Sequence, residues 1–296
     1  SKWAWSTPKL SEGDGVNRKR KNSKLMEEGE MALIECPECG QNVSDRAAAC
    51  PNCGYPVSAM IEKQKKDIDD LYDLGCKYLY GIGMPKDIDI GIEYLRKAAE
   101  QGHSKAQYSL GVMYAQGEKV KQDFSKAAEW FSKAAEQGNG SAQLKLAYMY
   151  QDGEGVPRSY EKFFEWYQKA AEHGTADMQY EVGAIYNDGK ENVPRNYEKA
   201  AEWWSKAAKQ GHEDAQWRLG FLYYFGDGVP KNYERAVEWW LKAAEQGSTA
   251  AQIYLGDAYE NGKGVPQSYE KAIEWYRRAG DAYSRQRIAE IWKLLE

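Results

Sequence analysis

A stretch of about 36 residues recurs along this chain, and this repetition constrains the fold more than any other feature. The segment from Asp214 to Gly247 returns, altered but legible, between Ser141 and Gly174. A glycine marks each step of 36 residues, with a single step of 37, at Gly102, Gly138, Gly174, Gly211 and Gly247. A period in this range is typical of a stacked array of supersecondary units, in which each unit contacts mainly its neighbours.

The first half of each copy predicts an amphipathic helix. A small residue, a Leu or Val and a Tyr follow one another at i, i+4 and i+8, as in Ala215, Leu219 and Tyr223. This spacing places three side chains on one helical face. A very small residue stands beside that stripe in all six copies, at Gly75, Gly111, Ala147, Gly183, Gly220 and Gly256. Glycine is costly inside a helix, so its recurrence indicates close contact with a partner helix.

The second half predicts a turn and a second helix. The turn reads Gly-x-Gly-Val-Pro in its clearest form, which ends the first helix. Two residues after the proline position stands a residue that favours the N-cap, at Asp87, Asp123, Ser159, Asn196, Asn232 and Ser268. The second helix then carries an aromatic residue that we expect to pack as a knob against small residues, at Tyr94, Trp130, Trp166, Trp203, Trp239 and Trp275.

The pattern A-Q-x-x-L-G-x-x-Y-x-x-G-x-G-V-P-x-x-Y-x-K-A-x-E-W-W-x-K-A-A-E-Q-G resembles the Sel1-like repeat, a relative of the tetratricopeptide repeat. Six copies cover residues 69–280. The resemblance implies an all-α fold, a right-handed α-solenoid of antiparallel helix pairs whose first helices line a concave surface. It also implies a role in assembling protein complexes or in bacterial signalling. We expect residues 281–296 to form a capping helix, and residues 59–68 a linker or a lead-in helix.

Ahead of the array lie two Cys-x-x-Cys-Gly motifs, which contain Cys36, Cys39, Cys50 and Cys53. Each motif is a knuckle that turns two thiolates toward one ion, and two knuckles supply four sulfur ligands. Four thiolates leave no open position for water, so the sequence predicts a structural zinc site and not a catalytic one. Residues 31–58 resemble a short zinc ribbon. Its acidic side chains outnumber its single arginine, Arg46, which favours protein over nucleic acid as the ribbon's contact.

Composition narrows the function classes. The net charge is −5 and the isoelectric point near 5.5, which argues against a dedicated nucleic-acid binder. No apolar run approaches the roughly 20 residues needed to cross a bilayer, and the N-terminus lacks the apolar segment of a secretory signal. Five cysteines, four of them in paired motifs, point to metal in a reducing compartment, so we expect a cytoplasmic protein.

Residues 1–30 differ from the rest of the chain: they are polar, contain a basic run from Asn17 to Lys21, and predict disorder. We hypothesise that translation begins at Met31 and that the preceding residues are a leader outside the working protein. The alternative is a basic arm that binds nucleic acid or an acidic partner.

A partner should use positions of the first helices that point away from the repeated stripe. These positions vary between copies and carry large aromatic residues, most densely in copy five. We predict a partner-binding surface formed by Tyr148, Tyr180, Trp217, Phe221, Tyr224 and Phe225. Its centre is Trp217, Phe221 and Tyr224. The alternative for the positions equivalent to Tyr108, which include Tyr180 and Trp217, is that their side chains pack between adjacent copies.

No catalytic constellation accompanies these features. The histidines fall at boundaries between copies, where Asn139, Thr175 and Ser248 replace His103 and His212, so a turn or capping role is expected. The sequence predicts a non-enzymatic adaptor that binds a protein or peptide, with no small-molecule substrate and no membrane. Two alternatives stay open: a nucleic-acid-associated regulator that uses the basic leader and the ribbon, and a regulatory subunit of a neighbouring enzyme or secretion system.

Overall fold

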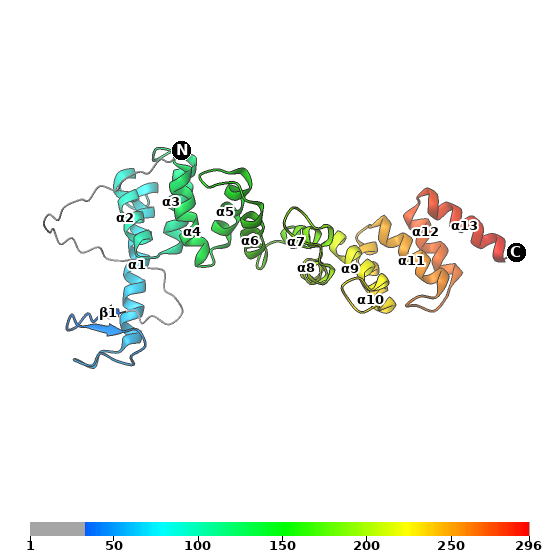
Figure 1. Cartoon of the computed structure of the whole chain (residues 1–296), viewed down its shortest axis with the longest axis horizontal. Helices are drawn as coiled ribbons and strands as arrows, with labels where there is room; N and C mark the ends of the chain where they lie inside the picture. The colour runs from blue at the N-terminus through cyan, green and yellow to red at the C-terminus, as the bar shows by residue number, and fades with distance from the viewer. Residues whose placement is uncertain (1–32, 296) are drawn as a thin grey trace, which may run out of the picture. The chain divides into compact units, whose positions relative to one another are not determined.

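The structure is a computed structural model that describes residues 33–295, and the expectations for residues 1–30 lie outside that range. The chain divides into two compact units, one up to Lys66 and one from Asp67 onward. The first is a small cysteine-rich module and the second is an array of helix pairs (Figure 1). The predicted all-α solenoid of six helix pairs behind a small cysteine-rich module is confirmed.

The cysteine-rich unit is built on one short hairpin. Strands β1 (Leu33–Glu35) and β2 (Asn42–Ser44) pair antiparallel, with Ile34 opposite Val43. Helix α1 (Val57–Tyr80) begins directly after the second knuckle and contains residues 59–68, so that segment is helical and not an irregular linker. The unit's core is minimal: Cys36, Val43, Cys50, Val57 and Met60 are its buried apolar residues.

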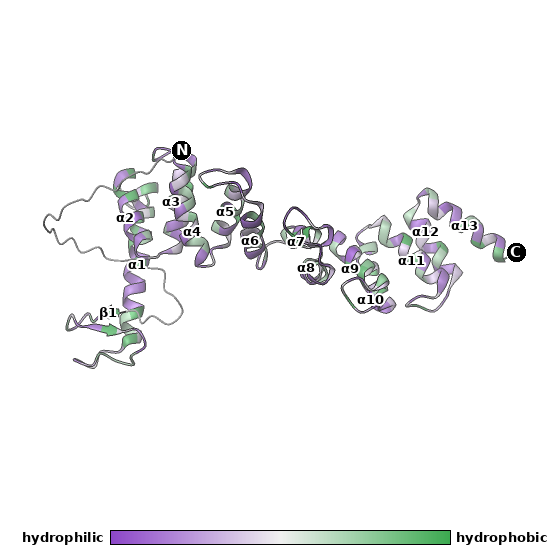
Figure 2. Cartoon of the chain, viewed as in Figure 1, coloured by the Kyte–Doolittle hydropathy of each residue, from purple (hydrophilic) through white to green (hydrophobic). Residues whose placement is uncertain are grey.

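The array consists of alternating first and second helices. After α1 come α2 (Ile88–Glu100), α3 (Ser104–Gln116), α4 (Phe124–Glu136), α5 (Gly140–Asp152), α6 (Tyr160–Ala171), α7 (Ala176–Asp188), α8 (Tyr197–Lys209), α9 (Glu213–Phe225), α10 (Tyr233–Glu245), α11 (Thr249–Asn261), α12 (Tyr269–Ala279) and α13 (Ala282–Leu295). Apolar and polar residues are interspersed along the helices (Figure 2). The second helices bury one face, as Ala236, Trp240 and Ala243 do in α10. No helix within residues 33–295 combines the length and apolar character needed to cross a membrane.

The predicted helix boundaries have the expected causes. All six predicted N-caps accept a hydrogen bond from the backbone amide three residues on, for example Asn232 Oδ1 from Arg235 N at 2.8 Å. The first helices of copies two, three, five and six end at Gly117, Gly153, Gly226 and Gly262, all in the left-handed region. These signals act within one turn, which explains why sequence alone located them.

The buried knob of the second helices is one residue later than predicted. Trp203 is buried, but Tyr94, Trp130, Trp166, Trp239 and Trp275 are only partly buried. Each of the six rings carries a cation from the side chain three residues on, Lys97, Lys133, Lys169, Lys206, Lys242 and Arg278. One face of each ring packs against the protein, and the other face contacts the cation.

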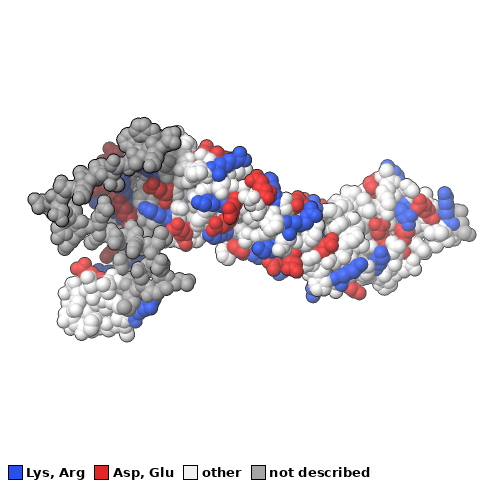
Figure 3. Space-filling model, in the orientation of Figure 1, with Lys and Arg blue, Asp and Glu red and all other residues white. Residues whose placement is uncertain are grey.

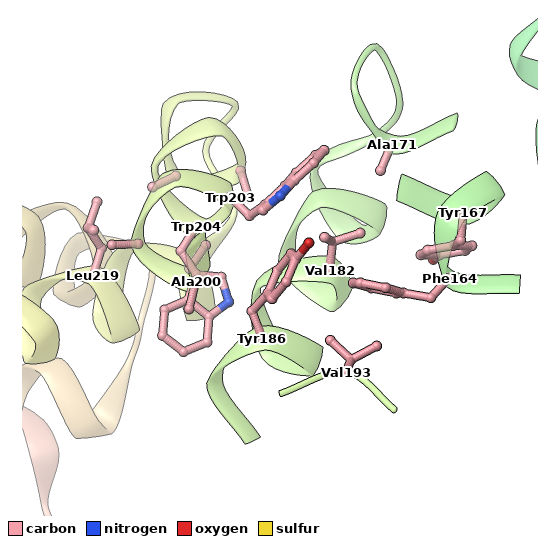
Figure 4. Close-up of a cluster of buried hydrophobic side chains, with 14 of the residues drawn as sticks. Phe164, Tyr167, Ala171, Val182, Tyr186, Val193, Ala200, Trp203, Trp204 and Leu219 are labelled. Carbon is pink, nitrogen blue, oxygen red and sulfur yellow. The ribbon is translucent and has the colours of Figure 1, made fainter. Parts of the chain in front are cut away.

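The space between paired helices is filled instead by the next residue along each second helix. These residues are Leu95, Phe131, Tyr167, Trp204, Trp240 and Tyr276, and all are buried. Trp240 packs directly on Gly220, where a Cβ atom would lie 2.5 Å from its ring, and its Nε1 donates to the carbonyl of Trp217 at 3.2 Å. The close contact predicted at the helical glycines is therefore confirmed. The partner is Leu95 at Gly75 and an aromatic ring at Gly111, Gly183, Gly220 and Gly256. Figure 4 shows one such cluster, in which Trp204 and Tyr186 lie among residues of α6, α7 and α8.

Neighbouring copies are joined by glutamines whose role the sequence did not reveal. In copies two to six, a buried glutamine donates its amide to a carbonyl of the preceding second helix: Gln107, Gln143, Gln179, Gln216 and Gln252. Gln216 also accepts from Gln246 at 2.8 Å, which links two successive junctions. The signal was present, because the glutamine recurs at one position of every copy that has a predecessor.

Candidate metal centre and partner-binding face

Two matched backbone turns hold the four cysteines. Gly40 N donates to Cys36 O and Gly54 N to Cys50 O, both at 2.8 Å. Gly40 and Gly54 have φ of 70° and 78°, a conformation that favours glycine. The hairpin β1–β2 flanks the first turn, and a bridge between Ala49 and Pro56 closes the second. The sequence predicted both knuckles because each is a local motif.

The structure brings the four sulfur atoms together at one point. All lie within 4.8 Å of one another, with Cys36 Sγ 3.5 Å from Cys53 Sγ and Cys39 Sγ 3.6 Å from Cys50 Sγ. Sulfur ligands at about 2.3 Å from a tetrahedral zinc ion lie about 3.8 Å apart, so the donor set fits such an ion. Cys36 and Cys50 are buried, whereas Cys39 and Cys53 are exposed. No position is left for water or substrate, as a structural site requires.

Two cysteines of the cluster have shifted pKa values. Hydrogen bonds, chiefly from the Asn52 side chain, lower the pKa of Cys39 to about 6. For Cys53 the backbone hydrogen bond at Tyr55 lowers the pKa, but burial and the neighbouring sulfurs outweigh it and raise the pKa to about 12. Thiolates this close repel one another, and a positive charge between them relieves that repulsion. A divalent ion supplies that charge, which is the chemistry expected of a zinc ribbon.

On the array, the structure brings together four of the six residues predicted to bind a partner. Trp217, Phe221 and Phe225 follow one another along α9, with ring centroids 6.1 Å and 4.4 Å apart. Tyr224 joins Phe225 at 5.0 Å, and Tyr254 of α11 lies 6.0 Å from Phe221. We call Trp217, Phe221, Tyr224, Phe225 and Tyr254 the α9 aromatic face. Phe225 is 48% exposed, which is unusual for a phenylalanine.

A pocket of about 180 Å³ opens beside this face. Aromatic and aliphatic side chains form its walls, and three polar side chains reach its edge; together they are Asn187, Tyr197, Trp204, Trp217, Arg218, Phe221, Leu222 and Asp227. Two nitrogen atoms of these side chains, Trp217 Nε1 and Arg218 Nε, are buried without a hydrogen-bond partner in the described part of the chain. An unpaired buried donor costs about 1–3 kcal/mol, so both atoms call for an acceptor from elsewhere.

The other two predicted residues lie apart from the α9 aromatic face. Tyr148 of α5 is 44% exposed and contacts Phe163 and Tyr167 of α6, not α9. Tyr180 of α7 stacks on His212 at 4.5 Å and lies 6.3 Å from Trp204. Tyr180 therefore follows the alternative reading, in which this position packs between adjacent copies. Trp217 packs in the same way, toward Tyr254 of copy six.

In copy six the equivalents of Phe221 and Tyr224 are Asp257, which is partly buried, and Glu260, which is buried. Tyr276 donates to both carboxylates, and Tyr283 of α13 donates to Asp257 at 3.0 Å. Arg287, also on α13, forms an ion pair with Glu260. The C-terminal helix thus covers the face that copy five leaves open. The sequence does not reveal that these positions are covered, because that depends on where α13 packs.

The capping role expected of the histidines is confirmed for His103 and His212. His103 Nδ1 accepts from Ala106 N at 3.0 Å and His212 Nδ1 from Ala215 N at 3.2 Å, so both rings cap a first helix. Asn139 and Thr175 do the same at their copies, whereas Ser248 makes no side-chain cap. A ring nitrogen that accepts a hydrogen bond carries no proton, so Nδ1 of both rings serves as a helix cap.

Comparison with known families agrees with this architecture. The model of the Sel1 repeat matches six times, at residues 68–103, 104–139, 140–175, 176–212, 213–248 and 249–284. A zinc-ribbon domain matches residues 32–57. A search among curated proteins found no match.

Solved structures include similar repeat proteins. A Sel1 repeat protein from Oxalobacter formigenes is 36% identical, with a TM-score of 0.56, over 74% of this chain and 64% of that one. The protein c5321, a protective antigen of uropathogenic Escherichia coli, is 34% identical with a TM-score of 0.49, over 78% of this chain and 51% of that one. The present chain thus spans one half to two thirds of the length of these two proteins.

Proposed function

Because this chain belongs to the Sel1 repeat family, we propose that it is a non-enzymatic adaptor that holds a protein or peptide on the α9 aromatic face. Sel1 repeat proteins are generally protein-interaction scaffolds. The observation that carries the proposal for this chain is the pocket beside Trp217 and Phe221, which lies next to the exposed ring of Phe225. Aromatic anchors around a pocket with a polar edge are what a binding hot spot requires.

The rest of copy five supports a binding role because its packing positions are already filled. Ala215, Leu219 and Leu222 of α9 are buried, and Trp240 fills the space beneath Gly220. Trp217 and Tyr224 pack against the edge of this core. Phe221, which is partly buried, and Phe225, which is exposed, lie outside that core. Adjoining aromatic rings that reach the surface mark an interaction site.

For the ribbon we propose a structural zinc ion held by Cys36, Cys39, Cys50 and Cys53. When bound, the ion supplies the folding energy that so small a core lacks, and it performs no catalysis. A reduced four-cysteine cluster fits a reducing compartment, so we place the protein in the cytoplasm.

The test uses a random peptide library displayed on phage and the full chain immobilised with zinc. Peptides enriched by the wild-type chain should be lost when the partly buried ring of Phe221 and the exposed ring of Phe225 are both removed, Phe221→Ala with Phe225→Ala, by at least about tenfold in recovery. Tyr224 stays intact because it packs on Trp240 at 5.3 Å. Far-UV circular dichroism should be unchanged.

The matched control removes two exposed aromatic residues elsewhere, Tyr80→Ala with Trp292→Ala, whose side chains are 63% and 49% exposed. This control should retain the wild-type peptides. Equal recovery by both double variants would show that the α9 aromatic face does not bind, and loss of helical signal in the first would show that it belongs to the core.

A further inference from the structure

The charges around the α9 aromatic face point to the chemistry of its partner. We propose that the face binds an acidic peptide, in which an apolar side chain enters the pocket and neighbouring Asp or Glu carboxylates pair with Arg218 and Lys263. The inference rests on the proposed function, since it names the partner class for the same face.

Two cations bracket the face. The guanidinium of Arg218 lies over Trp217 at 5.1 Å and over Trp204 at 5.6 Å. At the other side, the ammonium of Lys263 lies 5.2 Å from the ring centre of Tyr224 and donates to its hydroxyl at 2.9 Å. That hydrogen bond raises the pKa of Lys263, so the side chain keeps its charge. Within residues 33–295 neither cation has a carboxylate within ion-pair distance.

The acidic side chains at equivalent positions of adjacent copies are already engaged. Glu181 of α7, which corresponds to Arg218, accepts a hydrogen bond from Tyr167. Asp257 and Glu260 of α11 accept from Tyr276, and Glu260 also pairs with Arg287. These three carboxylates thus have internal partners, whereas neither cation of this face forms an ion pair within residues 33–295. The unmet charge is positive.

The pocket adds a second, independent demand for an acceptor. Trp217 Nε1 and Arg218 Nε are buried and unpaired, and both residues line the pocket. An ionised carboxylate accepts without donating and carries the charge complementary to Arg218. Asp227 also lines the pocket, and its negative charge opposes this pairing because it repels an incoming carboxylate. It forms no ion pair with Arg218 in the structure. A substitution of Asp227 therefore offers a further way to change the charge of the site.

Single-stranded nucleic acid also combines phosphates with stacking bases, but the surface favours a peptide. Nucleic acid needs a continuous positive track. Figure 3 shows Lys and Arg interspersed with Asp and Glu along the visible face of the array. The chain as a whole carries a net charge of −5. Two isolated cations around a small apolar pocket suit a short acidic segment.

The test sequences the library peptides recovered by the full chain and measures the affinity of the most enriched one by fluorescence anisotropy. We expect enriched peptides to combine an aliphatic or aromatic residue with Asp or Glu. Arg218→Gln with Lys263→Gln should weaken the best peptide about five- to tenfold and abolish the acidic preference. Lys133→Gln with Lys242→Gln removes the same charge from the outer edge of second helices and should leave affinity unchanged. Asp227→Asn should tighten binding about twofold.

The outcomes separate the two proposals. Enriched peptides that are neutral or basic, yet lost with Phe221→Ala and Phe225→Ala, would overturn the acidic partner and leave the binding face standing. No peptide that depends on this face would overturn both. Displacement of the bound peptide by an oligothymidylate, abolished in the Arg218 and Lys263 double variant, would assign the face to nucleic acid instead.

Discussion

The cysteine-rich unit and the helical array are stabilised in opposite ways. The ribbon buries five apolar residues, two of which are Cys36 and Cys50 of the metal cluster, so its stability is concentrated at one point. The array spreads the same task over six copies, each with its own cap, its own packed aromatic or aliphatic knob and its own junction to the next copy. The contrast teaches that one ligand can decide whether the ribbon folds, whereas any single change in the array acts mainly on its neighbourhood.

Removing the metal should give the largest effect. Chelation, or Cys50→Ser, should unfold the ribbon while the array keeps its helical signal, because structural zinc contributes about 10–16 kcal/mol to such modules. Zinc content by atomic absorption and protease cleavage between residues 33 and 56 would measure this. Cys76→Ser, which changes the half-buried fifth cysteine outside the cluster, should retain zinc. If the zinc-free ribbon resists protease, the stability of the ribbon is not concentrated at the metal cluster.

Within the array, two adjacent tryptophans should behave differently. Trp240→Ala should lower the free energy of unfolding by about 3–5 kcal/mol, because the indole is fully buried against Gly220. Trp239→Ala should cost about 1 kcal/mol, since its ring is partly exposed and carries Lys242. Urea denaturation followed by circular dichroism gives both values. The reverse order would restore the register that the sequence suggested.

The two glycines of one turn sharpen the account of the junctions. Gly226 and Gly228 have φ of 85° and 68°, so Ala at either costs about 1–2 kcal/mol. A Cβ at Gly228 would also lie 2.3 Å from the Tyr197 carbonyl carbon of the preceding copy, whereas at Gly226 the nearest atom, Lys231 Cβ, would be 3.2 Å away. Gly228→Ala should therefore destabilise the protein roughly twice as much. Equal losses of stability in thermal denaturation would mean that the backbone around Tyr197 shifts to accommodate the added Cβ atom.

The smallest effect concerns pH. Burial lowers the pKa of His103 and outweighs the opposing effect of Asp69. The folded state then binds a proton less readily than the unfolded state, whose histidine pKa is about 6.5. Stability from neutral His103 is complete above that pH and is lost as the pH falls below it. His103→Asn keeps the cap, as Asn139 does, and should reduce the stability difference between pH 7.5 and 5.5. An identical pH dependence in both proteins would contradict this role.

Much of the fold could be predicted because its signals are local. The caps, the turns and the knuckles each act within a few residues, so Asn232 or Cys36 carries its meaning in its immediate neighbours. The candidate site was predicted in part. The variable aromatic positions of α9 were identified, but Tyr180 packs on His212, and the copy-six equivalents Asp257 and Glu260 are covered.

By itself, the sequence determined that this protein is an array of six helix pairs behind a four-cysteine module. A period of 36 residues and two matched knuckles admit few other folds. Only the tertiary structure decided which tryptophan of each pair is buried and which aromatic residues remain free. A rotation of about 100° separates adjacent helical residues, so Trp239 and Trp240 differ in burial only through the direction from which the partner helix approaches. The pocket beside Phe221 has the same origin: it exists where residues of α7, α8 and α9 meet.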